Sequence, residues 1–223
     1  LNSNKMSIVE NIKNEIKAQF EGEATGHDWH HIMRVYNVSK FIQSKEGGDL
    51  ETIELAALLH DISDHKFNGG KLDEGGKVTE EILRRHEASD ELIKNVRYIV
   101  DNISFKGAKV KAEMESLEGK IVQDADRLDA IGAIGIARTF AYGGNRNQPI
   151  YEPSGEVVLH DSFEAYAHAK TSSINHFYEK LLLLKDRLNT KTGIELGEKR
   201  HKIMTDFLNE FHNEWNFNQE ENN

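Results

Sequence analysis

Helical spacing of apolar residues runs through this sequence from one end to the other and constrains the fold more than any other feature. Only two prolines, Pro149 and Pro153, interrupt the 223 residues. Near the amino end, Ile8, Ile12 and Ile16 follow one another at intervals of four, which places them on one face of a helix. We find no convincing run of alternating apolar and polar residues of the kind that a half-buried strand shows. The sequence therefore predicts an all-α fold.

The same pattern divides the chain into helices separated by glycines and polar caps. Asp28 and Asp49 are suited to cap helices, because a short side-chain oxygen can accept a hydrogen bond from a free N–H of the first turn. Gly193 is interpreted as the break in a C-terminal helical hairpin, and residues 143–155 as a long loop. The expected helices span residues 7–20, 28–47, 49–60, 73–86, 89–100, 116–142, 162–188 and 194–217.

We expect one domain over residues 1–223. With 38% hydrophobic and 30% charged residues, a chain of this length can bury a substantial core. Residues 1–5 are interpreted as a remnant ahead of a natural start at Met6, and residues 216–223 as a polar tail.

Charge and composition narrow the classes of partner. A formal net charge of −10 argues against a general nucleic-acid binder, which usually presents a basic face. No apolar run approaches the roughly 20 residues that a membrane helix needs, and the amino end lacks the apolar core of a signal peptide. We therefore expect a cytoplasmic protein with no membrane partner. Because the chain has no cysteine, any transition metal must be held by His, Asp or Glu.

Three of the expected helices carry a metal-binding side chain on the face that otherwise is apolar. His31 lies on the same helical face as Val35. His60 and Asp61 end an apolar run. Asp126 interrupts a stripe of small residues. Each has an ordinary structural explanation, because a buried histidine is often only hydrogen-bonded and nearby arginines can compensate an aspartate. Together they favour a shared metal site, since a buried ionised carboxylate without a partner costs several kcal/mol.

The spacing of these residues resembles the H…HD…D signature of the HD superfamily of metal-dependent phosphohydrolases, which fold as all-α helical bundles. His31 begins a His-x-x-Arg-Val segment, and Asp126 lies in Ala-Asp-Arg-Leu. The resemblance to the bacterial YpgQ-like subgroup covers essentially the whole chain. It rests on residues 27–31, 61–64, 123–138 and 140–155 and on the C-terminal hairpin.

The resemblance implies one divalent metal ion held by four side chains: His31, His60, Asp61 and Asp126. Two imidazoles and two carboxylates suit Mn²⁺, Fe²⁺, Ni²⁺, Co²⁺ or Zn²⁺ better than Ca²⁺, and Mg²⁺ is a less natural alternative. The subgroup implies Mn²⁺. Many relatives carry a histidine near residues 100–105, where this chain has Asn102 and Ser104, so we expect one ion rather than two.

Other residues are expected to act on the substrate. The resemblance implies a catalytic role for Asp61, and for Asp64 as a base or an orienting group for water, with capping of its loop as an equal alternative. Lys66, Arg34 and Arg138 are candidates for binding phosphate, although a loop lysine such as Lys66 is as often only solvated.

A second tier of residues is expected to support the site. His27 and Arg127 are candidates for second-layer residues that hold the metal ligands in orientation. His176 is a candidate for a residue that approaches the pocket. Arg146 and Lys106 are weaker candidates for substrate contact, because exposed basic residues are common.

The leading functional hypothesis is a (deoxy)nucleoside triphosphate pyrophosphohydrolase that releases monophosphate and pyrophosphate by attack of metal-bound water. A phosphomonoesterase or phosphodiesterase acting on nucleotides with the same metal site is the nearer alternative. An HD-type di-iron oxygenase needs more histidine ligands than the sequence offers, and a catalytically silent HD binding module usually lacks signature ligands. The amphipathic C-terminal pair is compatible with a homodimer.

Overall fold

Helices form all the regular structure in the part of the chain that the computed structural model describes, residues 7–20, 28–62, 75–103, 114–158 and 171–217. The prediction of an all-α fold is confirmed. The α-helices are α1 (Ile8–Phe20), α2 (Trp29–Glu46), α3 (Leu50–Leu59), α4 (Gly75–Arg85), α5 (Asp90–Asn102), α6 (Leu117–Asp129), α7 (Gly132–Asn145), α9 (Ser173–Glu179) and α10 (Lys191–Asn216). Two short 3₁₀ turns, η1 (Leu181–Leu183) and η2 (Lys185–Arg187), join α9 to α10.

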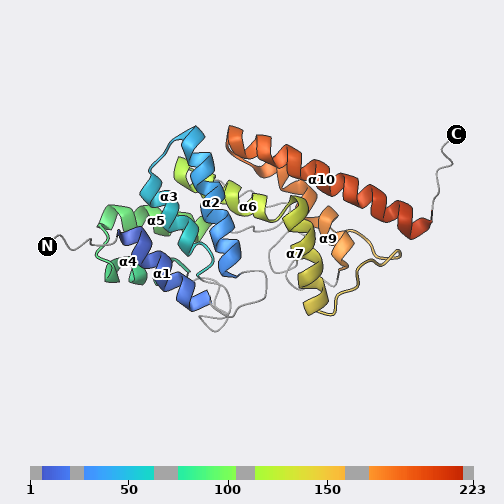
Figure 1. Cartoon of the computed structure of the whole chain (residues 1–223), viewed down its shortest axis with the longest axis horizontal. Coiled ribbons are helices and arrows are strands. Elements are labelled where there is room, and N and C mark those ends of the chain that lie inside the picture. Colours follow the sequence, from blue (N-terminus) through green and yellow to red (C-terminus); the bar gives the residue numbers. More distant parts are fainter. Residues whose placement is uncertain (1–6, 21–27, 63–74, 104–113, 159–170, 218–223) are drawn as a thin grey trace.

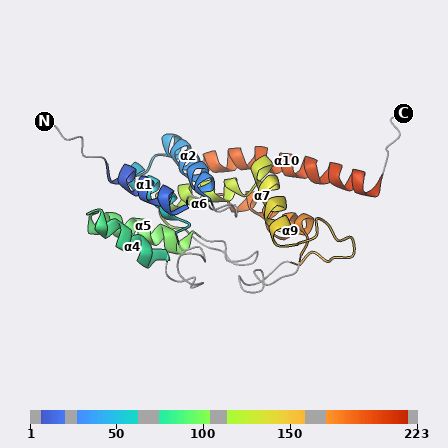
Figure 2. The ribbon, with the colours of Figure 1, turned by 60° about the horizontal axis from the view of Figure 1, so that its bottom comes forward.

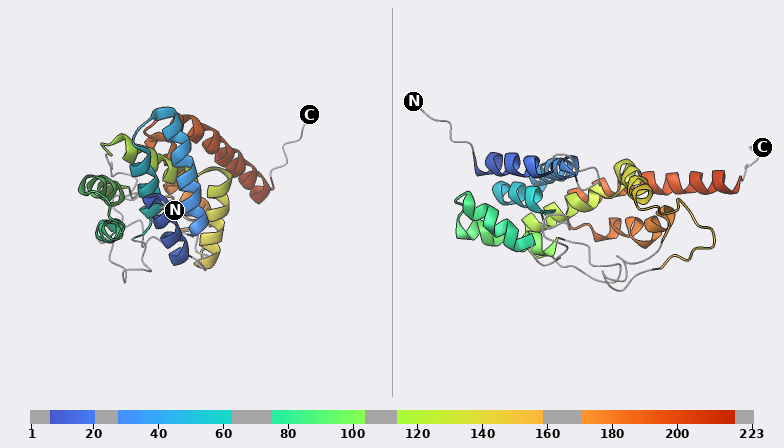
Figure 3. Two further views of the ribbon diagram at one scale, coloured as in Figure 1. Left: turned by 60° about the vertical axis from the view of Figure 1, so that its left-hand side comes forward. Right: turned by 90° about the horizontal axis from the view of Figure 1, so that it is seen from below.

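The helices are arranged along an elongated molecule with α6 between its two ends. Helices α1 to α5 form one end, and α7, α9 and α10 form the other (Figure 1). Helix α6 packs against α2 and α3 on one side and α10 on the other. Helix α1 and the last turns of α10 lie at opposite ends of the molecule (Figures 2 and 3). Side chains on α6 can therefore reach both halves.

Two aspartates fix where the helices that carry the predicted ligands begin. Asp28 Oδ1 accepts a hydrogen bond from the His31 N–H at 2.9 Å, and Asp49 Oδ2 accepts one from the Thr52 N–H at 2.8 Å. Both predicted N-caps are confirmed. The apolar faces of these helices, including fully buried Ile32, pack into the core.

The helix expected over residues 116–142 is instead two helices, so that prediction was wrong. Ile131 is extended between α6 and α7, and Gly132 has a φ of 76°, a left-handed conformation that costs a residue with a Cβ about 1–2 kcal/mol. Arg200 of α10 covers the break and donates a hydrogen bond to the Leu128 carbonyl at the end of α6. Because of this break, the axis of α7 does not continue the axis of α6. Helix α7 also continues to Asn145, into the region expected to be a loop.

The C-terminal hairpin also differs from the prediction in its first arm. Within the described residues this arm is the short α9 followed by the two 3₁₀ turns, and not one helix reaching Leu188. Gly193 lies inside the first turn of α10 and does not break it, because Thr190 caps the helix just before. A Cβ at Gly193 would lie 2.4 Å from Asp124 Oδ2, so close approach to α6 explains the glycine.

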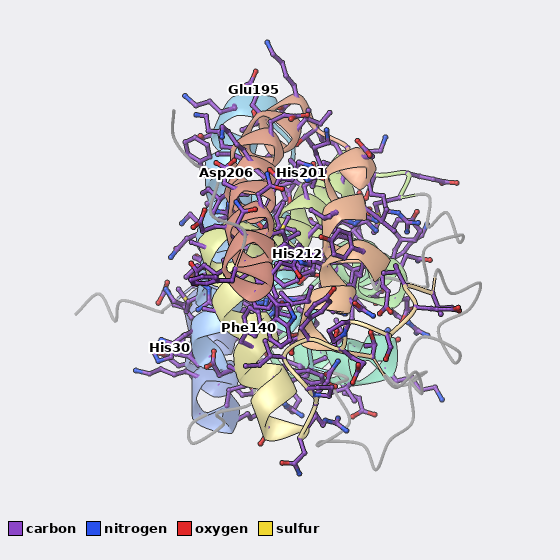
Figure 4. All side chains as sticks on the ribbon, turned by 90° about the vertical axis from the view of Figure 1, so that its right-hand side faces the viewer. His30, Phe140, Glu195, His201, Asp206 and His212 are labelled. Carbon is purple, nitrogen blue, oxygen red and sulfur yellow. The ribbon has the colours of Figure 1, made fainter. Side chains whose placement is uncertain are left out.

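Aromatic rings join the helices of the second half. Phe177 of α9 lies 6.1 Å from Phe140 of α7 and 5.9 Å from Phe207 of α10, measured between ring centroids. His212 of α10 faces α9, where its Nε2 is 3.1 Å from the Tyr178 hydroxyl (Figure 4). These contacts fix α9 against both neighbours.

No helix among the described residues is both long enough and apolar enough to cross a membrane.

The break before α7 gives a test of the fold. Replacing Gly132 with alanine forces a Cβ into a left-handed conformation and to 3.0 Å from the Arg200 Cβ and Cγ. We expect Gly132→Ala to lower the free energy of unfolding by about 1–3 kcal/mol, measured by urea denaturation. Gly144→Ala is the matched control, because Gly144 is helical and a Cβ there meets no atom within 4 Å. The control should be neutral or stabilising by up to about 1 kcal/mol. Equal behaviour of the two variants would contradict this explanation of the helix break.

Candidate metal centre

Three separate helices bring four of the predicted side chains to one point. His31 lies in the first turn of α2, His60 and Asp61 directly follow α3, and Asp126 lies in the second half of α6. His31 Nε2 is 3.2 Å from His60 Nε2 and 3.1 Å from Asp61 Oδ2. Asp126 Oδ1 lies 3.7 Å from His31 Nε2 and 3.8 Å from His60 Nε2. Ligand atoms of His31, His60 and Asp126 all fall within 4.8 Å of one another.

The cluster is buried on its histidine side and open on its carboxylate side. The His31 and His60 side chains are each 1% exposed, whereas those of Asp61 and Asp126 are 19% and 33% exposed. A small molecule can therefore approach past the carboxylates.

The second nitrogen of each imidazole is already hydrogen-bonded. His60 Nδ1 is 2.8 Å from the Ala57 carbonyl oxygen, which can only accept, so this nitrogen carries the hydrogen. His31 Nδ1 is 2.7 Å from Asp129 Oδ2, and an ionised carboxylate likewise only accepts. Both Nε2 atoms therefore direct lone pairs into one space beside two carboxylates. The two lone pairs and the two carboxylates repel one another unless a proton or a metal cation lies between them. Metal-binding histidines adopt the same orientation.

A proton can fill this space when no metal is bound. Burial lowers the pKa of His31, but hydrogen bonds with Asp129 and Asp61 and the charges of Asp61 and Asp126 outweigh that effect and raise the pKa to about 9. A divalent ion must displace this proton to bind. The donor set fits such an ion, because it offers two imidazole nitrogens and two carboxylates.

Asp129 is the residue that sequence reasoning missed. Its buried carboxylate binds three side chains from two other helices: His31 Nδ1, Arg34 at 2.7 and 3.0 Å, and Arg138 at 3.0 Å. Arg138 also donates to the Asp129 backbone carbonyl at 3.2 Å. A signal for this contact existed in the sequence, because Arg34 follows His31 by three positions and Asp129 follows Asp126 by three.

The partners of Asp129 keep it ionised. Burial alone raises the pKa of this carboxyl, but hydrogen bonds from His31 and Arg34 and the charges of His31 and Arg138 hold it well below its usual range. An ionised Asp129 accepts the His31 hydrogen and fixes the ring orientation.

The structure places the remaining predicted residues in different ways. Arg34 and Arg138 lie beside the cluster, both bound to Asp129, while Arg127 donates to the Arg187 carbonyl and so holds the segment before α10. Arg146 is exposed, with its guanidinium 5.3 Å from the centroid of the Tyr142 ring. His27, Asp64, Lys66 and Lys106 lie outside the described residues, so their roles stay predictions.

His176 keeps a neutral ring. Burial and the neighbouring charge of Lys180 lower its pKa to about 3. It lies one turn before Lys180 on α9, and Lys180 in turn feels the charge of Asp126. The expected approach of His176 to the pocket itself stays a prediction.

The helical fold and the mixed imidazole–carboxylate cluster are those of the HD superfamily of hydrolases, and a comparison with known families agrees. The HD domain model matches residues 28–131. This range contains all four candidate ligands and Asp129.

Individual relatives are similar to this chain over nearly its whole length. YpgQ of Bacillus subtilis is 38% identical over 201 residues, which cover 90% of each chain. Its crystal structure in complex with ADP superimposes with a TM-score of 0.72 and 33% identity, covering 92% of this chain and 97% of YpgQ. The chain therefore belongs to the YpgQ-like family of HD-domain proteins.

Two further crystal structures share this fold. An HD-superfamily hydrolase from Bacillus thuringiensis has a TM-score of 0.73 and 40% identity, covering 93% of this chain and 96% of its own. A protein from Lactobacillus plantarum has a TM-score of 0.84 and 33% identity, covering 95% of this chain and 98% of its own. The resemblance inferred from sequence motifs is confirmed.

Binding of a metal to this cluster can be tested by thermal unfolding. At a Mn²⁺ concentration of about 100 Kd, an ion that binds only the folded protein stabilises it by about 2.7 kcal/mol. We expect Mn²⁺ to raise the melting temperature of the wild type and to leave that of His31→Gln unchanged. His30→Gln is the matched control, because His30 is an exposed neighbour on α2 (Figure 4) and should keep the Mn²⁺ shift. A shift that survives in His31→Gln would place the ion elsewhere.

The role of Asp129 can be separated from that of the ligands. Asp129→Asn removes the charge that orients His31, and such changes behind a ligand typically weaken metal affinity by about 10–100-fold. We expect this loss in calorimetric titrations with Mn²⁺. Asp186→Asn is a control with 78% side-chain exposure, and it should bind Mn²⁺ like the wild type. Unchanged affinity in folded Asp129→Asn would show that His31 needs no such partner.

Proposed function

We propose that this protein is a metal-dependent nucleotide phosphohydrolase that cleaves (deoxy)nucleoside triphosphates to the monophosphate and pyrophosphate. The observation that carries the proposal is the convergence of the His31 and His60 Nε2 atoms with the Asp61 and Asp126 carboxylates at a partly open site. Membership of the HD superfamily of hydrolases supports the reaction class.

The nucleotide substrate class is supported by a relative. The crystal structure of YpgQ from Bacillus subtilis contains ADP, and YpgQ covers 90% of this chain. A nucleotide polyphosphate also matches the chemistry of the site, because a phosphate oxygen can enter on the exposed side formed by Asp61 and Asp126.

In this proposal the side chains of the site have different roles. His31, His60, Asp61 and Asp126 hold one divalent ion, with Mn²⁺ as the working ion. When bound, such an ion lowers the pKa of a coordinated water and polarises the phosphoryl group. Asp129 keeps the His31 ring oriented through the bond to Nδ1.

The remaining roles concern the substrate and the attacking water. Arg34 and Arg138 present positive charge beside the cluster while bound to Asp129, which suits an anionic substrate. Asp64 is assigned to orienting or deprotonating the water and Lys66 to binding phosphate; both lie outside the described residues.

Product analysis tests the proposal directly. Protein loaded with Mn²⁺ is incubated with a panel of nucleoside and deoxynucleoside triphosphates, and the products are separated by ion-exchange chromatography. We expect monophosphate and pyrophosphate in equal amounts. Asp61→Ala should lower the rate by about a hundredfold or more, since metal-assisted catalysis supplies several kcal/mol. Asp186→Ala, which removes an exposed carboxylate, should retain the wild-type rate.

Two other outcomes would contradict the proposed reaction. Release of inorganic phosphate alone would identify a phosphomonoesterase that uses the same site. No turnover of any triphosphate with Mn²⁺, Ni²⁺, Co²⁺, Fe²⁺, Zn²⁺ or Mg²⁺ would exclude the proposed substrate class.

A further inference from the structure

Arg200 of α10 lies at the junction of α6 and α7, where the chain turns at Gly132. Helix α10 packs against both of these helices and runs past their junction (Figure 1). The Arg200 Nη1 donates a hydrogen bond to the Leu128 carbonyl near the end of α6. Its Cβ and Cγ lie 3.0 Å from the point that a Cβ on Gly132 would occupy. One side chain therefore contacts both sides of the helix break.

The Leu128 carbonyl belongs to the peptide unit that precedes Asp129. A peptide unit is planar, so a hydrogen bond to its oxygen restrains the whole plane, including the N and Cα of the next residue. The peptide unit after Asp129 is restrained as well, because the Asp129 carbonyl accepts a hydrogen bond from Arg138 Nη1 at 3.2 Å. Two arginines, one from α10 and one from α7, therefore hold the peptide units on both sides of Asp129.

These restraints set the direction of the Asp129 side chain. Its Cα–Cβ bond leaves the backbone between the two peptide units, so holding both units limits where the carboxylate can point. The carboxylate oxygen Oδ2 lies 2.7 Å from His31 Nδ1, and this contact leaves His31 Nε2 directed toward His60 and Asp61. A displacement of the Leu128 carbonyl would therefore reach the candidate metal centre through Asp129.

Arg200 is more polar than coverage of Gly132 requires. The Leu128 carbonyl already accepts a hydrogen bond from the Ile131 N–H at 3.3 Å. Burial lowers the pKa of Arg200, which disfavours its charged form, and the charge of Asp129 opposes that effect. An apolar side chain of similar length could cover the glycine without the cost of burying a guanidinium. The property that arginine adds is a charged donor at the Leu128 carbonyl.

We propose that Arg200 is a positioning residue of the metal centre, which holds the peptide unit before Asp129 so that this carboxylate meets His31 Nδ1. The inference rests on the metal site of the proposed function, and it adds a residue that the sequence motifs do not contain. Arg200 contacts neither the ion nor the substrate in this proposal. Its effect on the ion passes through Asp129.

Calorimetric titration with Mn²⁺ tests whether Arg200 acts on the metal centre. The wild type is compared with Arg200→Met, Arg200→Gln, Arg200→Lys and Lys199→Met, each shown to be folded by urea denaturation. We expect Arg200→Met and Arg200→Gln to weaken Mn²⁺ binding by about tenfold, within the range typical of residues that influence a site without contacting its ligand. Arg200→Lys keeps a charged donor and should recover part of the affinity. Lys199→Met removes an exposed neighbour on α10 and should bind Mn²⁺ like the wild type.

A double-mutant cycle shows whether the effect passes through Asp129. Asp129→Asn already removes the charge that orients His31, so adding Arg200→Met to it should weaken Mn²⁺ binding by less than about twofold. A residue that only stabilised the fold would lower the melting temperature and leave the Mn²⁺ affinity of the folded protein unchanged. Wild-type Mn²⁺ affinity in folded Arg200→Met or Arg200→Gln would overturn the inference. An equal loss in both backgrounds, or failure of both variants to fold, would overturn it as well.

The outcomes also distinguish this inference from the proposed function. Mn²⁺ binding that depends on Arg200 in a protein that hydrolyses no triphosphate would support the inference and contradict the reaction. Triphosphate hydrolysis by the wild type, together with unchanged Mn²⁺ affinity in Arg200→Met, would support the reaction and contradict the inference.

Discussion

The candidate metal centre depends on one buried carboxylate that is surrounded by positive charge. Asp129 lies at the end of α6, and its bonds to His31, Arg34 and Arg138 join α6 to α2 and α7. An unpaired carboxylate at this depth would cost several kcal/mol, so the bonds to Asp129 stabilise the observed arrangement of the three helices. That arrangement also turns the His31 Nε2 toward His60. The stability of the core and the orientation of the candidate ligand thus have the same origin.

The two halves of the molecule contribute different chemistry to the site. The segment that matches the HD domain, residues 28–131, carries every candidate ligand and Asp129. Arg138, which binds Asp129, comes from α7 beyond that segment, and α6 connects the two parts. Helix α6 also anchors the start of α10, because Asp124 accepts hydrogen bonds from the backbone and hydroxyl of Thr190 at 2.7 Å. Both halves of the molecule therefore contribute side chains to the surroundings of the candidate metal centre.

The sequence predicted the parts of the structure that depend on local spacing. Helical periodicity was sufficient for the fold class. The position of His31 and His60 on apolar faces favoured a shared site, and the resemblance to the HD signature supplied the ligand set. Asp129 was missed although the spacing places it on the same face of α6 as Asp126, because spacing alone does not show which residue on that face pairs with His31 and Arg34. The break at Gly132 was missed for a related reason: the small residues around it continue a helical pattern, and the close approach of Arg200 to the left-handed glycine depends on packing between helices.

The sharing of Asp129 by two arginines has a consequence for mutational studies of this site. Residues in one hydrogen-bonded network do not contribute independently, and interaction energies of about 0.5–3 kcal/mol are typical. Once Asp129 is neutralised, the partners Arg34 and Arg138 have already lost their counterion, so removing either as well should cost less than the separate effects suggest. The three side chains therefore behave as one energetic unit, and a double-mutant cycle is the appropriate way to assign a contribution to any one of them.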